Sequence, residues 1–206
     1  MEMRKLALSV VVFSMLWAGC FTFRVGPERE EIRLWSLGPE HTPSELQNLS
    51  GPDVLVRDLG SALLYETRDL VAVTDSGMVT LASDDRWIEL PATMISDALA
   101  AALSGMDGFG SVVRSDPEIA EYALDGRLLE LGARRISGEW HAAVGVELRF
   151  GPSCGGQLLL SRVYSRRRPL SSLEYSELVA ALRELTKELV EEAAMDVALA
   201  AGLRTR

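Results

Sequence analysis

Residue types that carry nucleophilic or metal chemistry are scarce in this sequence. The chain has two cysteines, Cys20 and Cys154, and two histidines, His41 and His141. Cys154 lies in a Gly- and Pro-rich stretch typical of a turn, where no neighbouring base would activate its thiol. The histidines lie far apart, without the clustered ligands that a metal site needs. We therefore expect no catalytic residues, no metal and no cofactor.

Cys20 lies at the end of an N-terminal leader, where another chemistry acts on a thiol. Arg4 and Lys5 precede an almost wholly apolar run, residues 6–18. Such a run has the length of a signal-peptide core and is too short to span a bilayer as a helix. Residues 1–19 are thus predicted to be a signal peptide.

The residues beside Cys20 favour covalent acylation. Ala18 and Gly19 are small, as the narrow pocket of a signal peptidase requires, and the thiol that follows is where a diacylglycerol can be attached. This pattern resembles the bacterial lipobox, although Trp17 stands where Leu is usual. Two other interpretations are a secretory signal cut near Ala18 and an uncleaved anchor. In Gram-negative lipoproteins, an Asp directly after the acylated cysteine favours retention in the inner membrane. Residue 21 is Phe, so an acylated chain would be expected at the outer membrane.

Two charged motifs are candidates for binding. Asp84 and Asp85 are adjacent carboxylates, which we interpret as a solvated turn rather than a paired acid site. The run 166–168 is three arginines, and we favour a strand end kept soluble by charge over an anion site.

Net charge restricts the partners. The chain has 21 Lys and Arg against 30 Asp and Glu, a formal charge of -9. An acidic chain is repelled by phosphate backbones and by anionic lipid headgroups, so nucleic acid is not expected as a partner. Acyl chains at Cys20 would have to supply the membrane anchor.

Apolar periodicity and turn residues predict alternating strands and helices. Strands are expected over 32–37 and 54–59, followed by a hairpin, 65–74 and 78–82, around the turn 75–77. Pro91 favours a helix over 92–103, because a first-turn proline loses no hydrogen bond.

The second half predicts a meander and a long helix. A short strand (109–114) precedes three longer ones, separated by Gly-containing turns, and a Ser171/Glu174 capping box introduces a helix. The predicted ranges are 123–136, 139–150 and 157–166 for the strands and 172–199 for the helix. We expect an α+β fold: a two-layer single domain with a mixed, mostly antiparallel sheet and two main helices. The expected parts are the signal peptide, a tether (20–31) and this domain (32–206).

Several of these features together resemble a known family, the ABC-type transport auxiliary lipoproteins that accompany MCE-domain lipid transporters. A tether leads from Cys20 to the stretch around Trp35, where the family usually has Tyr-x-Leu near a proline. The hairpin then precedes the segment from Trp87 to Pro91, in which a Trp, an acidic residue and a Pro introduce the first helix. Trp87 itself is most simply a core residue under the helix start.

The resemblance implies a non-enzymatic docking subunit. Its expected partners are an MCE-domain periplasmic protein and the ABC transporter subunits, with acyl chains in the outer membrane and the domain facing the periplasm. Two other functions stay open: a soluble periplasmic domain that binds a small apolar ligand, and an envelope-assembly protein.

Overall fold

The computed structural model describes residues 31–38, 51–114 and 120–203. The predicted signal peptide, the predicted acylation site Cys20, nearly all of the predicted tether, and His41 lie outside the described residues. The chain from Ile32 to Arg206 forms one compact unit, and the fold is that of this unit.

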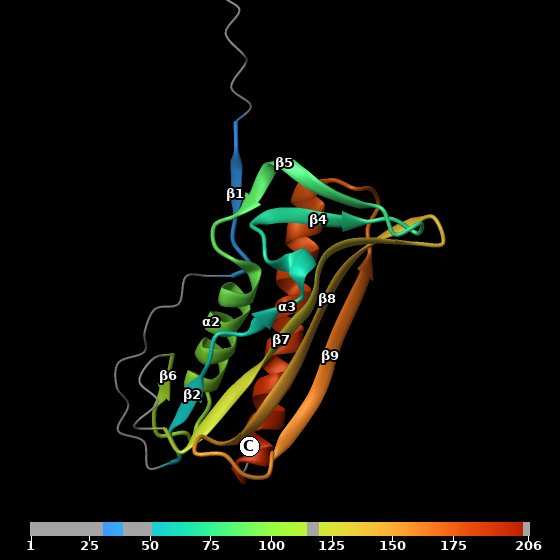
Figure 1. Cartoon of the computed structure of the whole chain (residues 1–206). Helices are drawn as coiled ribbons and strands as arrows, with labels where there is room; N and C mark the ends of the chain where they lie inside the picture. The colour runs from blue at the N-terminus through green and yellow to red at the C-terminus, as the bar shows by residue number, and fades with distance from the viewer. Residues whose placement is uncertain (1–30, 39–50, 115–119, 204–206) are drawn as a thin grey trace, which may run out of the picture. The chain divides into compact units, whose positions relative to one another are not determined.

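A long meander forms one side of the sheet (Figure 1). Strand β7 (Tyr122–Ile136) pairs antiparallel with β8 (Glu139–Pro152), which pairs antiparallel with β9 (Leu160–Pro169). The predicted meander is confirmed, with β9 shifted towards the C-terminus from the expected 157–166. The Ser137–Gly138 turn has both residues at positive φ (52° and 88°), as a two-residue hairpin turn of type I′ requires.

The other edge of β7 carries a series of short strands. Three of them, β2, β3 and β4, pair parallel with successive parts of β7. β6 pairs parallel with β2, β5 pairs antiparallel with β4, and β1 pairs parallel with β5. Their bounds are β1 Arg33–Trp35, β2 Val54–Val56, β3 Gly60–Ser61, β4 Asp69–Val73, β5 Val79–Trp87 and β6 Val112–Val113.

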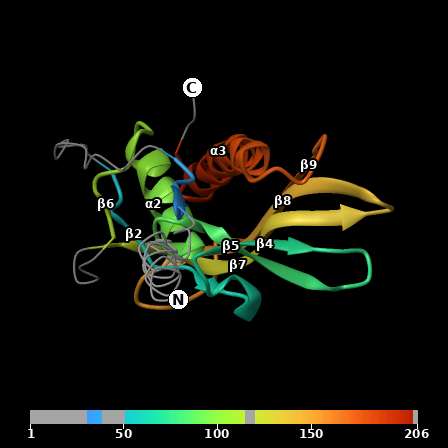
Figure 2. The same cartoon turned by 90° about the horizontal axis from the view of Figure 1, so that it is seen from above.

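Two helices, α2 (Pro91–Ser104) and α3 (Tyr175–Ala200), complete the second layer (Figures 1 and 2). α2 packs against β2, β6 and β7, while α3 packs against β7, β8 and β9 and against α2. The core between sheet and helices is aliphatic, with a few large aromatics. Its largest fully buried members include Trp87, Phe109, Phe150 and Tyr164. The predicted two-layer α+β fold is confirmed.

Helix α3 begins later than predicted, and the expected capping box is wrong. The helix starts at Tyr175, with Glu174 as its N-cap and no side-chain cap bond. Glu177 instead reaches back, and its carboxylate accepts hydrogen bonds from the Ser171 backbone N–H and hydroxyl, both at 2.8 Å. These bonds, the first above all, hold the pKa of Glu177 below its usual range.

The observed bounds of several strands also differ from the predicted ones. The hairpin expected from residue 65 begins at Asp69, because Leu63–Tyr65 form a 3₁₀ turn. The second strand of that hairpin runs to Trp87 instead of ending at 82. The stretch predicted as one strand over 54–59 contains only β2.

The two hairpins are joined at their tips, which lie side by side in Figure 2. The carboxylate of Asp75, in the β4–β5 turn, accepts the backbone N–H groups of Ser137 and Gly138 in the β7–β8 turn, at 3.0 and 2.9 Å. The predicted turn therefore positions a side chain that fixes one hairpin against the other.

Candidate anchoring and docking site

A single carboxylate fixes the strand through which the chain enters the domain. Asp85 is 2% exposed. Its carboxylate accepts the indole N–H of Trp35 and a guanidinium N–H of Arg33, each at 2.7 Å. β1 is only three residues long, so these two side-chain hydrogen bonds reinforce a short backbone ladder with β5.

Strand register explains why Asp85 is buried. Arg33 lies opposite Asp85 and Trp35 opposite Trp87, so all four side chains lie on one face of the β1–β5 pair. Burying Trp87 carries Asp85 inward with it, because residues two apart on a strand share a face. The expectation of a solvated turn at Asp84–Asp85 is wrong for this reason. The Asp-x-Trp spacing was the signal that could have revealed it.

Trp87 and Pro91 form the junction between β5 and α2. Trp87 is 1% exposed, and its backbone carbonyl and N–H both bond to Arg68. Pro91 is the first residue of α2. The Leu90 carbonyl accepts the Met94 N–H to close the first turn.

Helix α3 also contacts this region. The Nε–H of Arg183 donates to the carbonyl of Ser36, directly after β1, at 2.7 Å. Burial raises the pKa of Tyr175, and the nearby negative charge of Asp85 adds to this rise. The chain is therefore held on two sides where it enters, by β5 and by α3.

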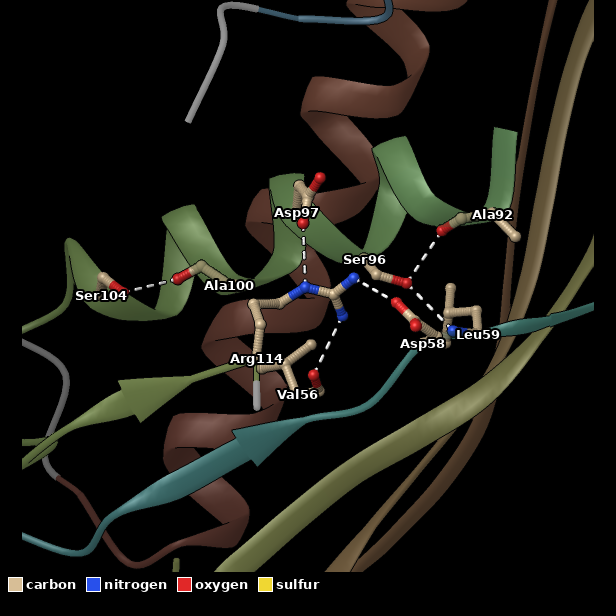
Figure 3. Close-up of polar contacts among 9 residues, drawn as sticks. All are labelled: Val56, Asp58, Leu59, Ala92, Ser96, Asp97, Ala100, Ser104 and Arg114. Atoms are coloured by element: carbon tan, nitrogen blue, oxygen red, sulfur yellow. Dashed lines mark hydrogen bonds and ion pairs between the residues drawn. The ribbon is translucent and has the colours of Figure 1, made fainter. Parts of the chain in front are cut away.

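A second polar cluster ties α2 to the sheet (Figure 3). The guanidinium of Arg114 donates to the carboxylates of Asp97 and Asp58 and, at 3.0 Å, to the backbone carbonyl of Val56. Each of its three nitrogens has its own acceptor: Asp97 is on α2, Val56 is the last residue of β2, and Asp58 follows β2. This fork fixes the end of β6 against both α2 and the chain after β2.

Ser96 makes the buried part of that cluster. Its hydroxyl donates to the Ala92 carbonyl at 2.8 Å and accepts the Leu59 N–H at 3.0 Å. Ser96 is fully buried, and its hydroxyl both donates and accepts a hydrogen bond inside the domain. It satisfies a backbone N–H that no strand partner reaches, so its role is structural.

The arginine-rich strand β9 is neutralised within the fold. Arg166 pairs with Glu192 and Arg168 with Glu188, both on α3. Arg167 points to the other face and pairs with Glu130. The run 166–168 is therefore neither a free anion site nor simply a solvated strand end. Its charges balance the acidic helix beside it.

The remaining sequence candidates are not brought together. His141 lies half-buried on β8 with Nδ1 3.2 Å from the carbonyl of Glu139, and Cys154 is an exposed free thiol. Over residues 31–38, 51–114 and 120–203, no group of three or more His, Cys, Asp and Glu could hold a metal ion. The polar side chains described above instead fix β1, through Asp85, and bind the helices to the sheet, as Arg114 does for α2.

Comparison with known proteins identifies the family. The model of the ABC-type transport auxiliary lipoprotein component family matches residues 36–194. The chain belongs to this family. The matched region starts directly after Trp35 and contains Asp85, Trp87, Pro91 and the Arg114 cluster. No curated protein sequence matches the chain significantly.

Solved structures share the fold. A protein from Xanthomonas campestris is 16% identical, with a TM-score of 0.68, covering 82% of this chain and 96% of its own. An uncharacterized protein is 15% identical, with a TM-score of 0.66, and the match covers 82% and 99%. A hypothetical protein from Chlamydia trachomatis is 10% identical at a TM-score of 0.51, over 73% and 99%.

Within the described residues, neither α2 nor α3 is both long enough and apolar enough to cross a membrane.

Proposed function

We propose that this protein is a membrane-anchored, non-enzymatic docking subunit of an ABC transport system. The transporter would include an MCE-domain periplasmic protein and move phospholipid or other apolar molecules between membranes. The family match over residues 36–194 carries the proposal. Membership gives the association with ABC transport, and the MCE partner and the lipid cargo are the proposed extension of it.

The anchor would be acyl chains on Cys20, which becomes the first residue once the leader is removed. Each buried methylene contributes about 0.8 kcal/mol, so several chains on one cysteine hold an acidic domain without a basic patch. Residues 21–32 link Cys20 to β1, the strand that Asp85 fixes, and this link spans at most about 45 Å. The proposed location is the outer membrane, with the domain facing the periplasm.

The first experiment compares the full-length protein with Cys20→Ala after expression in a Gram-negative host. The intact mass of the mature protein should show Cys20 at the N-terminus with acyl chains, and the variant should lack them. Separation of inner from outer membranes should place the wild type in the outer membrane. An unacylated N-terminus would refute the anchor.

A second experiment tests the partner. The acylated protein is purified from membranes of its own cells, and MCE-domain and ABC subunits should be recovered with it. Their consistent absence would refute the transport role. Native mass spectrometry showing lipid bound to the unacylated protein would then favour a ligand-binding domain instead.

A further inference from the structure

The outer edge of β5, which faces away from β4, is paired over only part of its length in the described chain. Its last residues, 85–87, pair with β1. In the described chain, no strand pairs with residues 79–83 on that side. This stretch reads Val-Thr-Leu-Ala-Ser and carries no charge. An uncovered strand edge presents a row of backbone donors and acceptors that another strand can satisfy.

Ladder geometry identifies which backbone groups face outward. The Thr74 N–H donates to the Met78 carbonyl at 2.9 Å, so the β4–β5 ladder is hydrogen-bonded at that position. Bonded and non-bonded positions alternate along an antiparallel pair. Thr80 is thus the next bonded residue, while Val79 and Leu81 direct their N–H and C=O groups away from β4.

Three apolar side chains at this edge are open to solvent. Met78 is 60% exposed, Val79 43% and Leu81 48%. The opposite edge strand, β9, has arginines along it and ends at Pro169, and charge and proline are the devices that keep strands from adding to an edge. The 79–83 stretch of β5 carries neither device.

We propose that the transporter docks by adding an extended strand to β5 alongside Val79–Ser83. The occupant is an extended segment of a partner subunit with apolar side chains at alternate positions. In the free protein, water solvates the outward N–H and C=O groups of Val79 and Leu81. An extended backbone can replace that water along the row, and apolar side chains would cover the exposed side chains of Val79 and Leu81. The pairing of β1 shows that this edge accepts a strand. The partner's identity rests on the proposed function.

Amide hydrogen exchange of the full-length acylated protein tests the edge directly, with Thr80 as the internal control. In the protein alone, the Val79 and Leu81 amides should exchange about a hundredfold faster than the Thr80 amide, since theirs lack a partner. In the complex with the transporter, both should slow towards Thr80. Slow exchange in the protein alone would mean the edge is already covered, and unchanged exchange in the complex would mean it is unused. Either result overturns the proposal.

Substitution at Leu81 gives a second test. Leu81→Pro removes an outward N–H and leaves the bonds to β4, whereas Leu81→Val keeps the N–H. Recovery of transporter subunits should fall about tenfold with Leu81→Pro, the effect of one hydrogen bond in a packed interface, and stay near wild type with Leu81→Val. Val79→Lys places a charge on the edge without touching the backbone and should lower recovery similarly.

The outcomes separate the two proposals. Equal recovery with wild type, Leu81→Pro and Val79→Lys would overturn strand addition and leave the transport role intact. If the wild type itself recovers no transporter subunit, the transport role fails and strand addition fails with it.

Discussion

Two strands near opposite ends of the sheet, β5 and β9, are fixed to the rest of the domain in different ways. Each carries one large buried aromatic, Trp87 on β5 and Tyr164 on β9. Around Trp87 the polar contacts converge on one buried carboxylate, Asp85. Around Tyr164 they spread into several partly exposed ion pairs between arginines of β9 and acids of α3.

The difference shows where loss of one residue is costly. A buried carboxylate that orients two donors specifies one position for β1, and removing it takes the acceptor from both donors. Solvent screens exposed ion pairs, and water replaces any one of them. We therefore expect the β5 side to depend on single residues and the β9 side on none of its charges.

The largest effect is expected from Trp87→Ala. The side chain is 1% exposed, and its removal leaves a cavity beside the start of α2. Denaturant unfolding should show a loss of about 3–5 kcal/mol in the free energy of unfolding. A loss below about 1 kcal/mol would show that the junction between β5 and α2 is not part of the core.

Asp85→Ala should lower the free energy of unfolding by about 2 kcal/mol, because Trp35 and Arg33 lose a charged acceptor. The loss is no larger because Arg33 can turn to solvent. The change should act on β1 in particular. The Ile88 N–H donates to the Trp35 carbonyl, so its amide should exchange faster in the variant. Asp84→Ala, one residue away, is the matched control and should leave that amide unchanged. Equal effects of the two variants would contradict a specific role for Asp85.

Much of the fold could be predicted from the sequence, because the signals were local. Turn residues at 75–77 and at Ser137–Gly138, and proline at Pro91, delimit elements by their own backbone preferences. Alternation along β7, β8 and β9 gave the meander in the same way. The family could also be inferred, because the Trp87-to-Pro91 segment and the order of elements are linear features.

The polar site could not be predicted fully, because its partners are far apart in the chain. Asp85 meets Arg33 and Trp35 from about fifty positions away, and the arginines of β9 meet acids of α3. Taken alone, two adjacent aspartates indicate a turn and three arginines a solvated strand end. Register and helix packing decided otherwise. The late start of α3 has a local cause instead, since Glu177, inside the helix, binds Ser171 only a few residues before it.

Tyr164 tests the β9 side of the comparison. Its hydroxyl donates to Asp196 at 2.8 Å, so Tyr164→Phe should cost about 1 kcal/mol at neutral pH. Burial, the Asp196 hydrogen bond and the charge of Asp196 raise the pKa of Tyr164. The unfolded chain loses this proton near pH 10 while the folded chain keeps it, so stability declines as pH rises above about 10.

Urea unfolding between pH 8 and 11 measures that decline. It should be shallower in Tyr164→Phe and not vanish, because the pKa values of Tyr65 and Tyr175 are also raised, chiefly by burial. An identical decline in wild type and variant would show that Tyr164 ionises as freely in the folded as in the unfolded chain.

The smallest effect is expected from Arg168→Gln. Arg168 and Glu188 are 2.9 Å apart, with side chains 42% and 51% exposed, so their pairing should contribute less than about 0.5 kcal/mol. A double-mutant cycle with Glu188→Gln, at low and at high salt, isolates the pair from its neighbours. A coupling above about 1.5 kcal/mol that survives high salt would mean that the arginines of β9 act together as a network. The two sides would then differ in the number of charged groups that stabilise each strand, and not in how exposed those groups are.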